Sequence, residues 1–363
     1  MSERVRVGVA GAGGWADLLH LPALTNHPRA EVVAICSRTR AHAEAMAQKY
    51  AIPQVFTDYR EMIDQAGLQA LVVVTPDALH YPITMDALDA GLHVICEKPL
   101  ALNADRAKAM YEKAEAAGVK HMVLFTSRWL PQYRYVQQLI DEGYIGRWLH
   151  CQLNYIGEYG RRPGYAWRFD RAQANGILGD LGPHMIDMAR WYVGDIARVS
   201  AHLHTFMDHP GPAGQPPDPA NDSAMLLLEF ANGAQGMIHV TAVAHVRGRG
   251  QDQHIALYGE GGTIELDLVD AKVSLQGARQ DTDRFSPLTI PDELWGGVDL
   301  TKSYIPRINE FFATEPVADR AFIDAILDNR PIAPNFYDGY KVQQVIDAAI
   351  ASSEQGCWIP IDK

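Results

Sequence analysis

The chain has 363 residues, a length at which two domains are expected because a single compact core of that size is uncommon. Its hydrophobic fraction of 47% and charged fraction of 21% are those of an ordinary globular protein. A formal net charge of -12, with no run of lysines or arginines, argues against a nucleic-acid partner. No apolar run approaches membrane-spanning length, and the first four residues lead into a strand pattern without a signal-peptide region, so we expect a cytoplasmic protein with no membrane partner.

Residues 1–125 alternate short strand patterns with helix patterns. Strands are expected at Val5–Val9, Val32–Cys36, Ala70–Thr75, His93–Cys96 and His121–Phe125. Helices are expected at Trp15–Asn26, Arg40–Tyr50, Tyr59–Ala66, Tyr81–Ala90 and Asn103–Ala117. This alternation predicts an α/β domain with a parallel sheet covered on both faces.

Residues 126–363 follow a different pattern and form the second predicted domain. Helices at Gln132–Gly143 and Gly182–Tyr192 flank a strand at Trp148–Tyr155. Consecutive strands then follow with short turns, which indicates an antiparallel sheet; they are Arg198–Phe206, Ser223–Phe230, Gln235–Ala242, His254–Tyr258, Gly262–Asp267 and Lys272–Ser274. The chain returns to helix at Ala318–Asn329 and Gly339–Glu354, and these C-terminal helices can pack back on the first domain.

A glycine turn follows the first strand and opens the first helix. It reads Gly11-Ala12-Gly13-Gly14-Trp15-Ala16. Gly11 permits the tight turn, Gly13 lets the backbone approach a pyrophosphate, and Ala16 allows helix and strand to pack closely, with the helix N-terminus facing the anion. A glycine-rich turn can also be purely structural, but its position between a strand and a helix favours a dinucleotide-binding site that includes Gly14 and Trp15.

The end of the second strand bears on the choice of dinucleotide. An acidic residue there would hold the ribose hydroxyls of NAD, whereas this chain has Ser37 and Arg38. The hydroxyl of Ser37 and the two guanidinium groups of Arg38 and Arg40 suit a 2′-phosphate, so the sequence favours NADP over NAD. The alternative is that the arginines are solvated residues at the start of a helix.

Two further strand ends carry polar groups at the same edge of the predicted sheet. Thr75 and Pro76 can flank the cofactor, and His80 either caps the next helix or contributes to binding. Glu97 and Lys98 follow the next strand, where the lysine can bind a cofactor ribose and a substrate hydroxyl. The alternative is a surface lysine paired with Glu97.

Asp180 and His184 form a candidate acid/base pair. Their i, i+4 spacing, with Asp180 at or just before the start of a helix, favours a carboxylate and an imidazole on one face. A histidine beside a carboxylate is a good general base for an alcohol proton. A core histidine is one alternative, and a metal site is another, but one histidine with two carboxylates is thin evidence for zinc, so we expect no metal.

Taken together, these motifs resemble those of the Gfo/Idh/MocA oxidoreductase family, which includes glucose–fructose oxidoreductase and inositol dehydrogenase. The resemblance covers essentially the whole chain and rests on Gly11-x-Gly13-x-x-Ala16, Thr75-Pro76, Glu97-Lys98-Pro99, Asp180-x-Gly182-x-His184-x-x-Asp187 and Tyr258-Gly259-Glu260-Gly261-Gly262-Thr263. It implies an N-terminal Rossmann domain and a C-terminal α/β domain with a large, mostly antiparallel open sheet. In the family this sheet often forms oligomer interfaces, so a homodimer or homotetramer is expected.

The resemblance also implies what the site does. Residues matching Lys98, Asp180 and His184 act at the hydride-transfer site on a sugar, cyclitol or related polyol, with NAD or NADP as cofactor. Thr126-Ser127-Arg128-Trp129 stands where many relatives have an Asn/Tyr-rich segment, so the substrate can differ from theirs.

Aromatic and arginine side chains around the Asp/His motif are candidate substrate ligands. Aromatic rings stack on sugar faces, and arginine binds hydroxyls or acidic groups. We expect Arg128, Tyr155, Trp167 and Arg168 to bind substrate together with Asp180 and His184, although ordinary packing is the alternative for any one of them.

The sequence therefore favours an NAD(P)-dependent dehydrogenase or reductase that acts on a secondary carbon of a sugar, cyclitol or sugar derivative. The alternative enzyme is a glycoside-cleaving one that holds NAD tightly and works by transient oxidation and elimination. A third possibility, a dinucleotide sensor without catalysis, is disfavoured because Lys98, Asp180 and His184 are all present.

Overall fold

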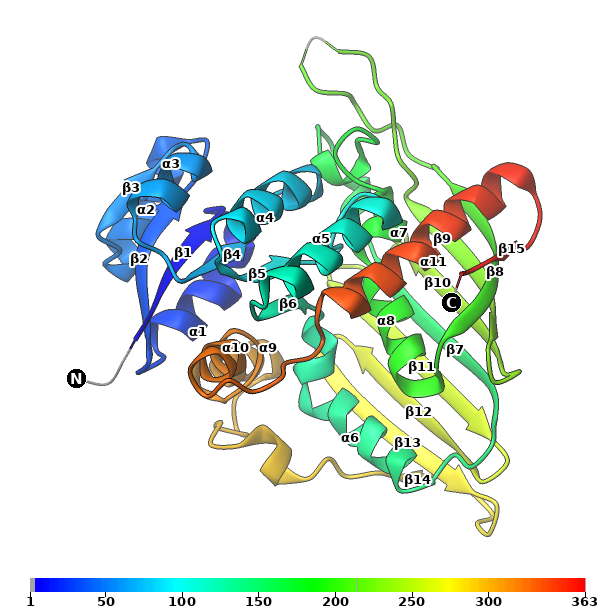
Figure 1. Cartoon of the computed structure of the whole chain (residues 1–363). Coiled ribbons are helices and arrows are strands. Elements are labelled where there is room, and N and C mark those ends of the chain that lie inside the picture. The colour runs from blue at the N-terminus through cyan, green and yellow to red at the C-terminus, as the bar shows by residue number, and fades with distance from the viewer. Residues whose placement is uncertain (1–3, 214, 363) are drawn as a thin grey trace. The chain divides into compact units, whose positions relative to one another are not determined.

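The computed structural model describes residues 4–213 and 215–362, and Met1–Glu3 at the start of the predicted first domain lie outside them. The chain forms two compact units (Figure 1). Unit 1 comprises residues 1–124 and 295–340, and unit 2 comprises residues 125–294 and 341–363. Division by sequence pattern placed residues 295–340 in the second domain, whereas their contacts place them in the first unit.

Unit 1 is built on a six-stranded parallel sheet with strand order β3-β2-β1-β4-β5-β6. The strands are β1 Val5–Ala10, β2 Ala30–Cys36, β3 Gln54–Phe56, β4 Ala70–Val73, β5 His93–Glu97 and β6 His121–Leu124. All six run parallel, as the alternating pattern predicted; β3 is an addition. Because β1 lies between β2 and β4, the strand order reverses beside its carboxyl end, the place where such sheets bind ligands.

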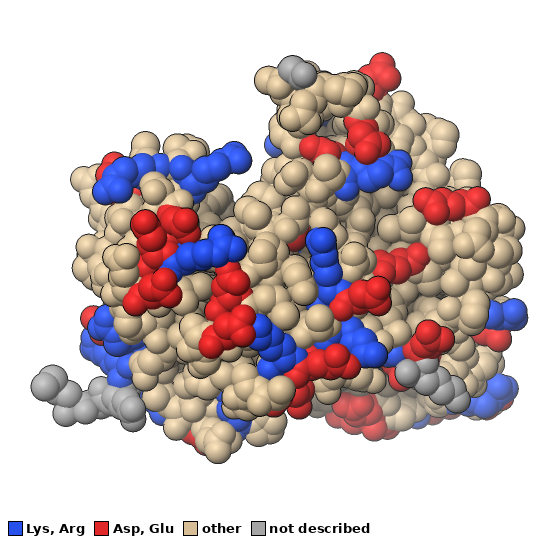
Figure 2. All heavy atoms as spheres, turned by 45° about the horizontal axis from the view of Figure 1, so that its top comes forward, with Lys and Arg blue, Asp and Glu red and all other residues tan. Residues whose placement is uncertain are grey.

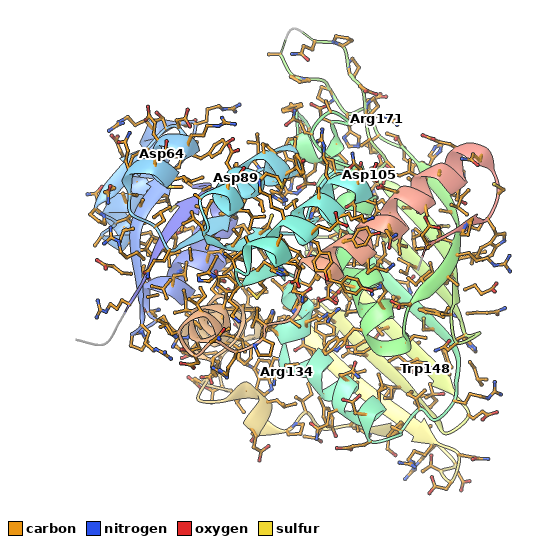
Figure 3. The ribbon with its side chains drawn as sticks, viewed as in Figure 1. Asp64, Asp89, Asp105, Arg134, Trp148 and Arg171 are labelled. Carbon is orange, nitrogen blue, oxygen red and sulfur yellow. The ribbon has the colours of Figure 1, made fainter. Side chains whose placement is uncertain are left out.

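Helices cover this sheet in two groups (Figure 1). They are residues Ala16–His20 continuing into α1 Leu21–Thr25, α2 Arg40–Tyr50, α3 Tyr59–Gln65, α4 His80–Asp89, α5 Ala104–Ala117, α9 Tyr304–Thr314 and α10 Ala318–Leu327. The first helix contacts α9 and α10, whereas α4 contacts α5. Lys113 of α5 pairs with Asp89 at the end of α4 at 2.6 Å, and Asp105 lies in the first turn of α5 (Figure 3). The 20-residue helix α11, Phe336–Gln355, begins in unit 1 and continues into unit 2.

Unit 2 is built on a nine-stranded sheet with strand order β14-β13-β12-β11-β7-β10-β9-β8-β15. The strands are β7 Trp148–Gly157, β8 Ile196–His204, β9 Ser223–Phe230, β10 Gln235–Thr241, β11 Gln251–Gly259, β12 Gly262–Val269, β13 Lys272–Arg279, β14 Ser286–Pro287 and β15 Ile359–Pro360. The sheet is mostly antiparallel, as expected, with β7 and β10 paired in parallel. The helices α6 Pro131–Asp141, α7 Gly176–Asp180 and α8 Gly182–Val193 accompany it, and α8 packs on β7 and β10.

The burial of β9 shows that this sheet covers a core on one face only. Ala224, Leu226 and Leu228 are buried, and the alternate residues Met225 and Leu227 are 53% and 52% exposed. A period of two is that of a strand with one face turned to the core. The other face is open at β9, where it carries the exposed apolar side chains of Met225 and Leu227.

The surface and the helices bear on possible partners. Figure 2 shows lysines and arginines interspersed with aspartates and glutamates on the face that it presents. Among the described residues, no helix combines the length and the apolar character needed to cross a bilayer.

Candidate functional site

The glycine turn lies at the carboxyl end of β1 and requires Gly11. Its φ of 120° is a conformation that favours glycine, and a Cβ there would overlap the Val74 carbonyl oxygen. The Gly11 N–H donates to the Cys36 carbonyl oxygen at 2.9 Å, which joins the turn to β2. The backbone therefore passes closely between two strand ends.

The outer surface of this turn is open. An added Cβ at Gly13 or Gly14 would meet no described heavy atom within 4 Å, whereas Ala16 is fully buried beneath them. Open backbone N–H groups at the start of a helix are suited to a phosphate anion. The turn thus fits the pyrophosphate of a dinucleotide.

Of the two arginines that follow β2, Arg38 is the one without an ion pair or hydrogen bond to the described residues. Arg40 pairs with Glu44 at 2.9 Å, and the Ser37 N–H donates to the Phe56 carbonyl oxygen at 3.2 Å. Arg38 is exposed and has no ion pair or hydrogen bond with any described residue. Its charge is available to a ligand.

The ends of β4 and β5 are joined by His80. This buried residue opens α4, and its Nδ1 lies 2.7 Å from the Pro99 carbonyl oxygen while its Nε2 lies 2.9 Å from that of Thr75. Burial lowers the pKa of the His80 imidazole. The Thr75 hydroxyl oxygen is itself buried without a hydrogen-bond partner among the described residues, as expected of a group reserved for a ligand. Pro76 follows Thr75 directly, and its carbonyl oxygen accepts from the Leu79 N–H at 2.9 Å.

Glu97 is the centre of a buried network at the end of β5. Its Oε1 accepts from the Trp15 indole N–H at 2.8 Å and lies 3.1 Å from His20 Nε2. Its Oε2 lies 3.2 Å from the Lys98 backbone N–H. His20 Nδ1 contacts Asp319 Oδ1 at 2.8 Å. The Glu97 carboxylate therefore contacts Trp15 and His20, which the alternative of a surface Lys98–Glu97 pair does not include.

Asp180 lies just before the helix of His184, as expected, but it ends a helix of its own. It is the last residue of α7, Leu181 joins the two helices, and α8 begins at Gly182. The i, i+4 spacing of Asp180 and His184 therefore spans the junction of α7 and α8, and the sharing of one face by the two side chains stays a prediction. The junction residue, Leu181, keeps a right-handed helical backbone conformation with φ of -90° and ψ of -30°.

The carboxylate of Asp180 is held by two side chains from the segment before it. Its Oδ2 accepts from the Tyr159 hydroxyl at 2.6 Å and pairs with Arg168 Nε at 3.1 Å. Burial and the neighbouring Asp180 carboxylate raise the pKa of Tyr159 well above its usual value, so its hydroxyl stays protonated and donates. The Arg168 guanidinium lies 4.4 Å from the centre of the Trp167 ring. Three predicted site residues and Tyr159 thus form one cluster.

His184 lies in the first turn of α8 and is 9% exposed. Its ring centre is 6.1 Å from that of Tyr155, whose hydroxyl donates to Gln251 at 2.5 Å. A neighbouring aromatic ring restricts how the imidazole can turn. These residues belong to unit 2, as does Asp180, whereas Lys98 belongs to unit 1.

Arg128 is paired with a buried carboxylate of α8. Its Nε and Nη2 donate to the two oxygens of Asp187 at 2.8 and 2.7 Å, and the Asp187 side chain is 1% exposed. The guanidinium also lies 5.5 Å from the centre of the Trp191 ring. Bidentate pairing with a buried carboxylate gives Arg128 a structural role. Its role in substrate binding stays a prediction.

Among the described residues, no group of three or more histidine, cysteine, aspartate or glutamate side chains could hold a metal ion. The sequence patterns singled out none of Tyr159, His20 and Asp319. The latter two are 299 positions apart, and no local pattern links such residues. The signal for Tyr159 was its place in the aromatic and arginine segment before the Asp/His motif.

Comparison with known proteins agrees with this geometry. Residues 5–125 match the family model described as "Oxidoreductase family, NAD-binding Rossmann fold", and residues 133–265 match the "GFO/IDH/MocA C-terminal domain". Levoglucosan dehydrogenase of Pseudarthrobacter phenanthrenivorans is 31% identical over 88% of this chain and 86% of the relative. D-glucoside 3-dehydrogenase of Escherichia coli is 29% identical over 98% of this chain and 97% of the relative.

A solved structure of levoglucosan dehydrogenase, in complex with NADH and levoglucosan, matches with a TM-score of 0.88 and 29% identity, covering 99% of this chain and all of the other. The fold and the site thus define a nicotinamide-dependent oxidoreductase. The chain belongs to the Gfo/Idh/MocA family, which confirms the resemblance carried by its motifs.

Proposed function

We propose that this enzyme transfers a hydride to or from a secondary carbon of a sugar, cyclitol or sugar derivative, with Lys98, Asp180 and His184 as its catalytic residues. The observation that carries the proposal is the cluster in which Tyr159 and Arg168 fix the carboxylate of Asp180. Its support is the similarity to dehydrogenases that are named for levoglucosan and D-glucoside. The cytoplasmic location expected from the sequence belongs to the same proposal.

In the proposed reaction a substrate hydroxyl loses its proton to His184 while the carbon that carries it gives up a hydride. The glycine turn would hold the pyrophosphate of a nicotinamide dinucleotide, which would supply the hydride acceptor. Lys98 donates a hydrogen bond to the oxygen on which negative charge develops. Asp180 stabilises the imidazolium that forms, because a carboxylate near a histidine favours its charged form. The alcohol becomes a ketone, and the reverse sequence reduces it.

Trp167 and Arg168 supply the remaining contacts to the substrate. The guanidinium above the indole forms a flat amphipathic surface of the kind that stacks on a sugar ring. Because Arg168 also pairs with Asp180, a ring bound there is connected to the acid/base pair. This arrangement favours a pyranose or its glycoside over a short linear alcohol.

The test is a screen of sugars, cyclitols, sugar acids and aryl glycosides with NAD and NADP, following absorbance of the reduced nicotinamide. We expect cofactor reduction with a cyclic polyol. A preference for short linear alcohols or amino acids would refute the proposal. Release of aglycone without net cofactor reduction would establish the glycoside-cleaving alternative, and dinucleotide binding with no turnover of any substrate would establish a sensor.

For the cofactor we propose NADP in preference to NAD, on the basis of the unengaged Arg38 at the end of β2. Replacement of Arg38 by alanine is expected to weaken NADP binding by about tenfold, because a charge-assisted bond to the 2′-phosphate is lost. NAD binding should change less than twofold. Titration of both dinucleotides measures this, with Arg60→Ala as a surface control. Tighter binding of NAD by the wild-type protein would contradict the proposal.

The open face of the nine-stranded sheet is proposed to bind a second copy of the chain in a homodimer or homotetramer. Met237 of β10, 37% exposed, stands opposite Leu227 of β9 in register, next to the exposed Met225. Contiguous apolar side chains on a surface mark an interaction site. Sedimentation equilibrium should therefore give a dimer or tetramer, and Leu227→Asp should shift it toward monomer. A monomeric wild-type protein at micromolar concentration would contradict this.

A further inference from the structure

Unit 1 contains three buried ionisable side chains in contact, with His20 between Asp319 and Glu97. His20 and Asp319 are both 0% exposed, and Glu97 is 6% exposed. One imidazole nitrogen faces each carboxylate, with Nδ1 2.8 Å from Asp319 and Nε2 3.1 Å from Glu97. Since a neutral imidazole has only one N–H, donation to both carboxylates requires the imidazolium.

The pKa shifts of His20 and Glu97 agree with a protonated imidazole at His20. Burial alone would lower the pKa of His20, but the carboxylates of Asp319 on α10 and Glu97 on β5 outweigh it and raise the pKa to about 10. The pKa of Glu97 is lowered although burial opposes this, because His20 binds it and Lys98 lies beside it. Both charged forms are therefore the stable ones at neutral pH.

Glu97 connects this buried network to two groups that the proposed function uses, Trp15 of the glycine turn and Lys98. The Glu97 oxygen that faces His20 also accepts from the indole of Trp15, which belongs to the glycine turn. The other oxygen lies against the backbone N–H of Lys98. The segment that carries Asp319 begins with Ala318, whose φ of 50° is a strained conformation for alanine. Such strain persists only where the surrounding contacts over-determine the backbone.

We propose that His20 is a positioning residue, which Asp319 holds in place and which in turn fixes Glu97, so that the glycine turn and Lys98 are set by one carboxylate. The imidazolium does not touch substrate or exchange a proton during turnover. It aligns the cofactor-binding turn through Trp15 and the lysine through its backbone. This inference rests on the proposed roles of the turn and of Lys98.

The experiment compares His20→Gln with His27→Gln. His27 is also buried in unit 1 and faces a carboxylate of α10, Asp324, at 3.5 Å, but it has no contact with Glu97 among the described residues. His20→Gln is expected to raise the dissociation constant for the reduced dinucleotide about tenfold and to lower kcat at saturating cofactor by a similar factor, since charge-assisted bonds to Glu97 are lost. His27→Gln should leave both within about twofold.

Trp15→Phe provides a variant at an exposed position, so it should fold normally. It removes the indole N–H that Glu97 accepts and is expected to weaken dinucleotide binding while the stability stays close to that of the wild type. Equal cofactor affinity and kcat in wild type and folded His20→Gln would overturn the proposal. Equal losses of dinucleotide affinity and kcat in His20→Gln and His27→Gln would also overturn the proposal, because a merely structural histidine would give that pattern.

NMR of protein with nitrogen-15 in histidine and tryptophan gives a readout independent of activity. Both His20 ring nitrogens should carry protons at about pH 8, where an ordinary histidine is neutral. The Trp15 indole resonance, identified by its loss in Trp15→Phe, should move in His20→Gln. A neutral His20, or an unmoved Trp15 resonance, would overturn the inference. If wild type bound neither dinucleotide while both NMR results held, the proposed function would fail and the network would stand.

Discussion

Replacement of His184 by alanine is expected to lower kcat by about a hundredfold or more, the usual scale for removing a positioned general base. His184 lies in the first turn of α8, and that helix is held by buried residues along its whole length, so the variant should fold. Lys98→Ala should lose activity on the same scale, because it removes a donor to the developing oxyanion. Steady-state kinetics with saturating cofactor and substrate measures both.

Lys108→Ala is the control for these variants. Lys108 is exposed on α5 and, within the described part of the chain, its one ion pair is with Glu112 a helical turn away, so its loss should leave kcat unchanged. Circular dichroism of all three proteins checks that they are folded. If His184→Ala turned over at nearly the wild-type rate when chemistry limits the reaction, another residue would have to accept the hydroxyl proton.

Arg128→Ala is expected to cost about 3–5 kcal/mol of the free energy of unfolding. Its guanidinium is the bidentate partner of Asp187, whose side chain is 1% exposed, so truncation leaves a buried carboxylate without that compensation. Urea unfolding followed by fluorescence measures the change, since Trp191 lies against the arginine.

Two variants make this result specific to the buried pair. Arg147→Ala removes a guanidinium from an exposed pair with Glu260 and should cost less than about 1 kcal/mol. The double replacement Arg128→Met with Asp187→Leu should recover much of the loss, because apolar side chains carry no desolvation penalty. A cost below about 1 kcal/mol for Arg128→Ala would show that water reaches Asp187. An intact fold with a raised KM would support the predicted role of Arg128 in substrate binding.

The strand ends that carry the candidate site could be predicted because they follow local patterns. A buried run of β-branched residues, then a turn, placed the glycine turn, Thr75 and Lys98 at one sheet edge. Local rules failed where an element is short or atypical. β3 has three half-buried residues and no alternation, and α9 has Pro306 in its first turn, where proline is tolerated but weakens a helix pattern.

The partners of the site residues could not be predicted in the same way. A separation of 82 positions between Trp15 and Glu97, or of 59 between Arg128 and Asp187, carries no periodic signal. The expectation that Asp180 shares one helical face with His184 stays a prediction, because Leu181 separates α7 from α8. The residue types at the site were readable, whereas their hydrogen bonds depend on the tertiary structure.

The division of unit 1 into two segments has a consequence for biosynthesis. Residues 295–340 belong to this unit, so the ribosome must complete all of residues 125–294 before α9 and α10 are made. Until then His20 lacks Asp319, and the face of the first helix that contacts α9 and α10 stays exposed. Native contacts between segments so distant in sequence form slowly. A nascent chain that stops at residue 294 should therefore present an unfinished first unit to chaperones, and a fragment ending near residue 124 would need residues 295–340 in trans to complete its fold.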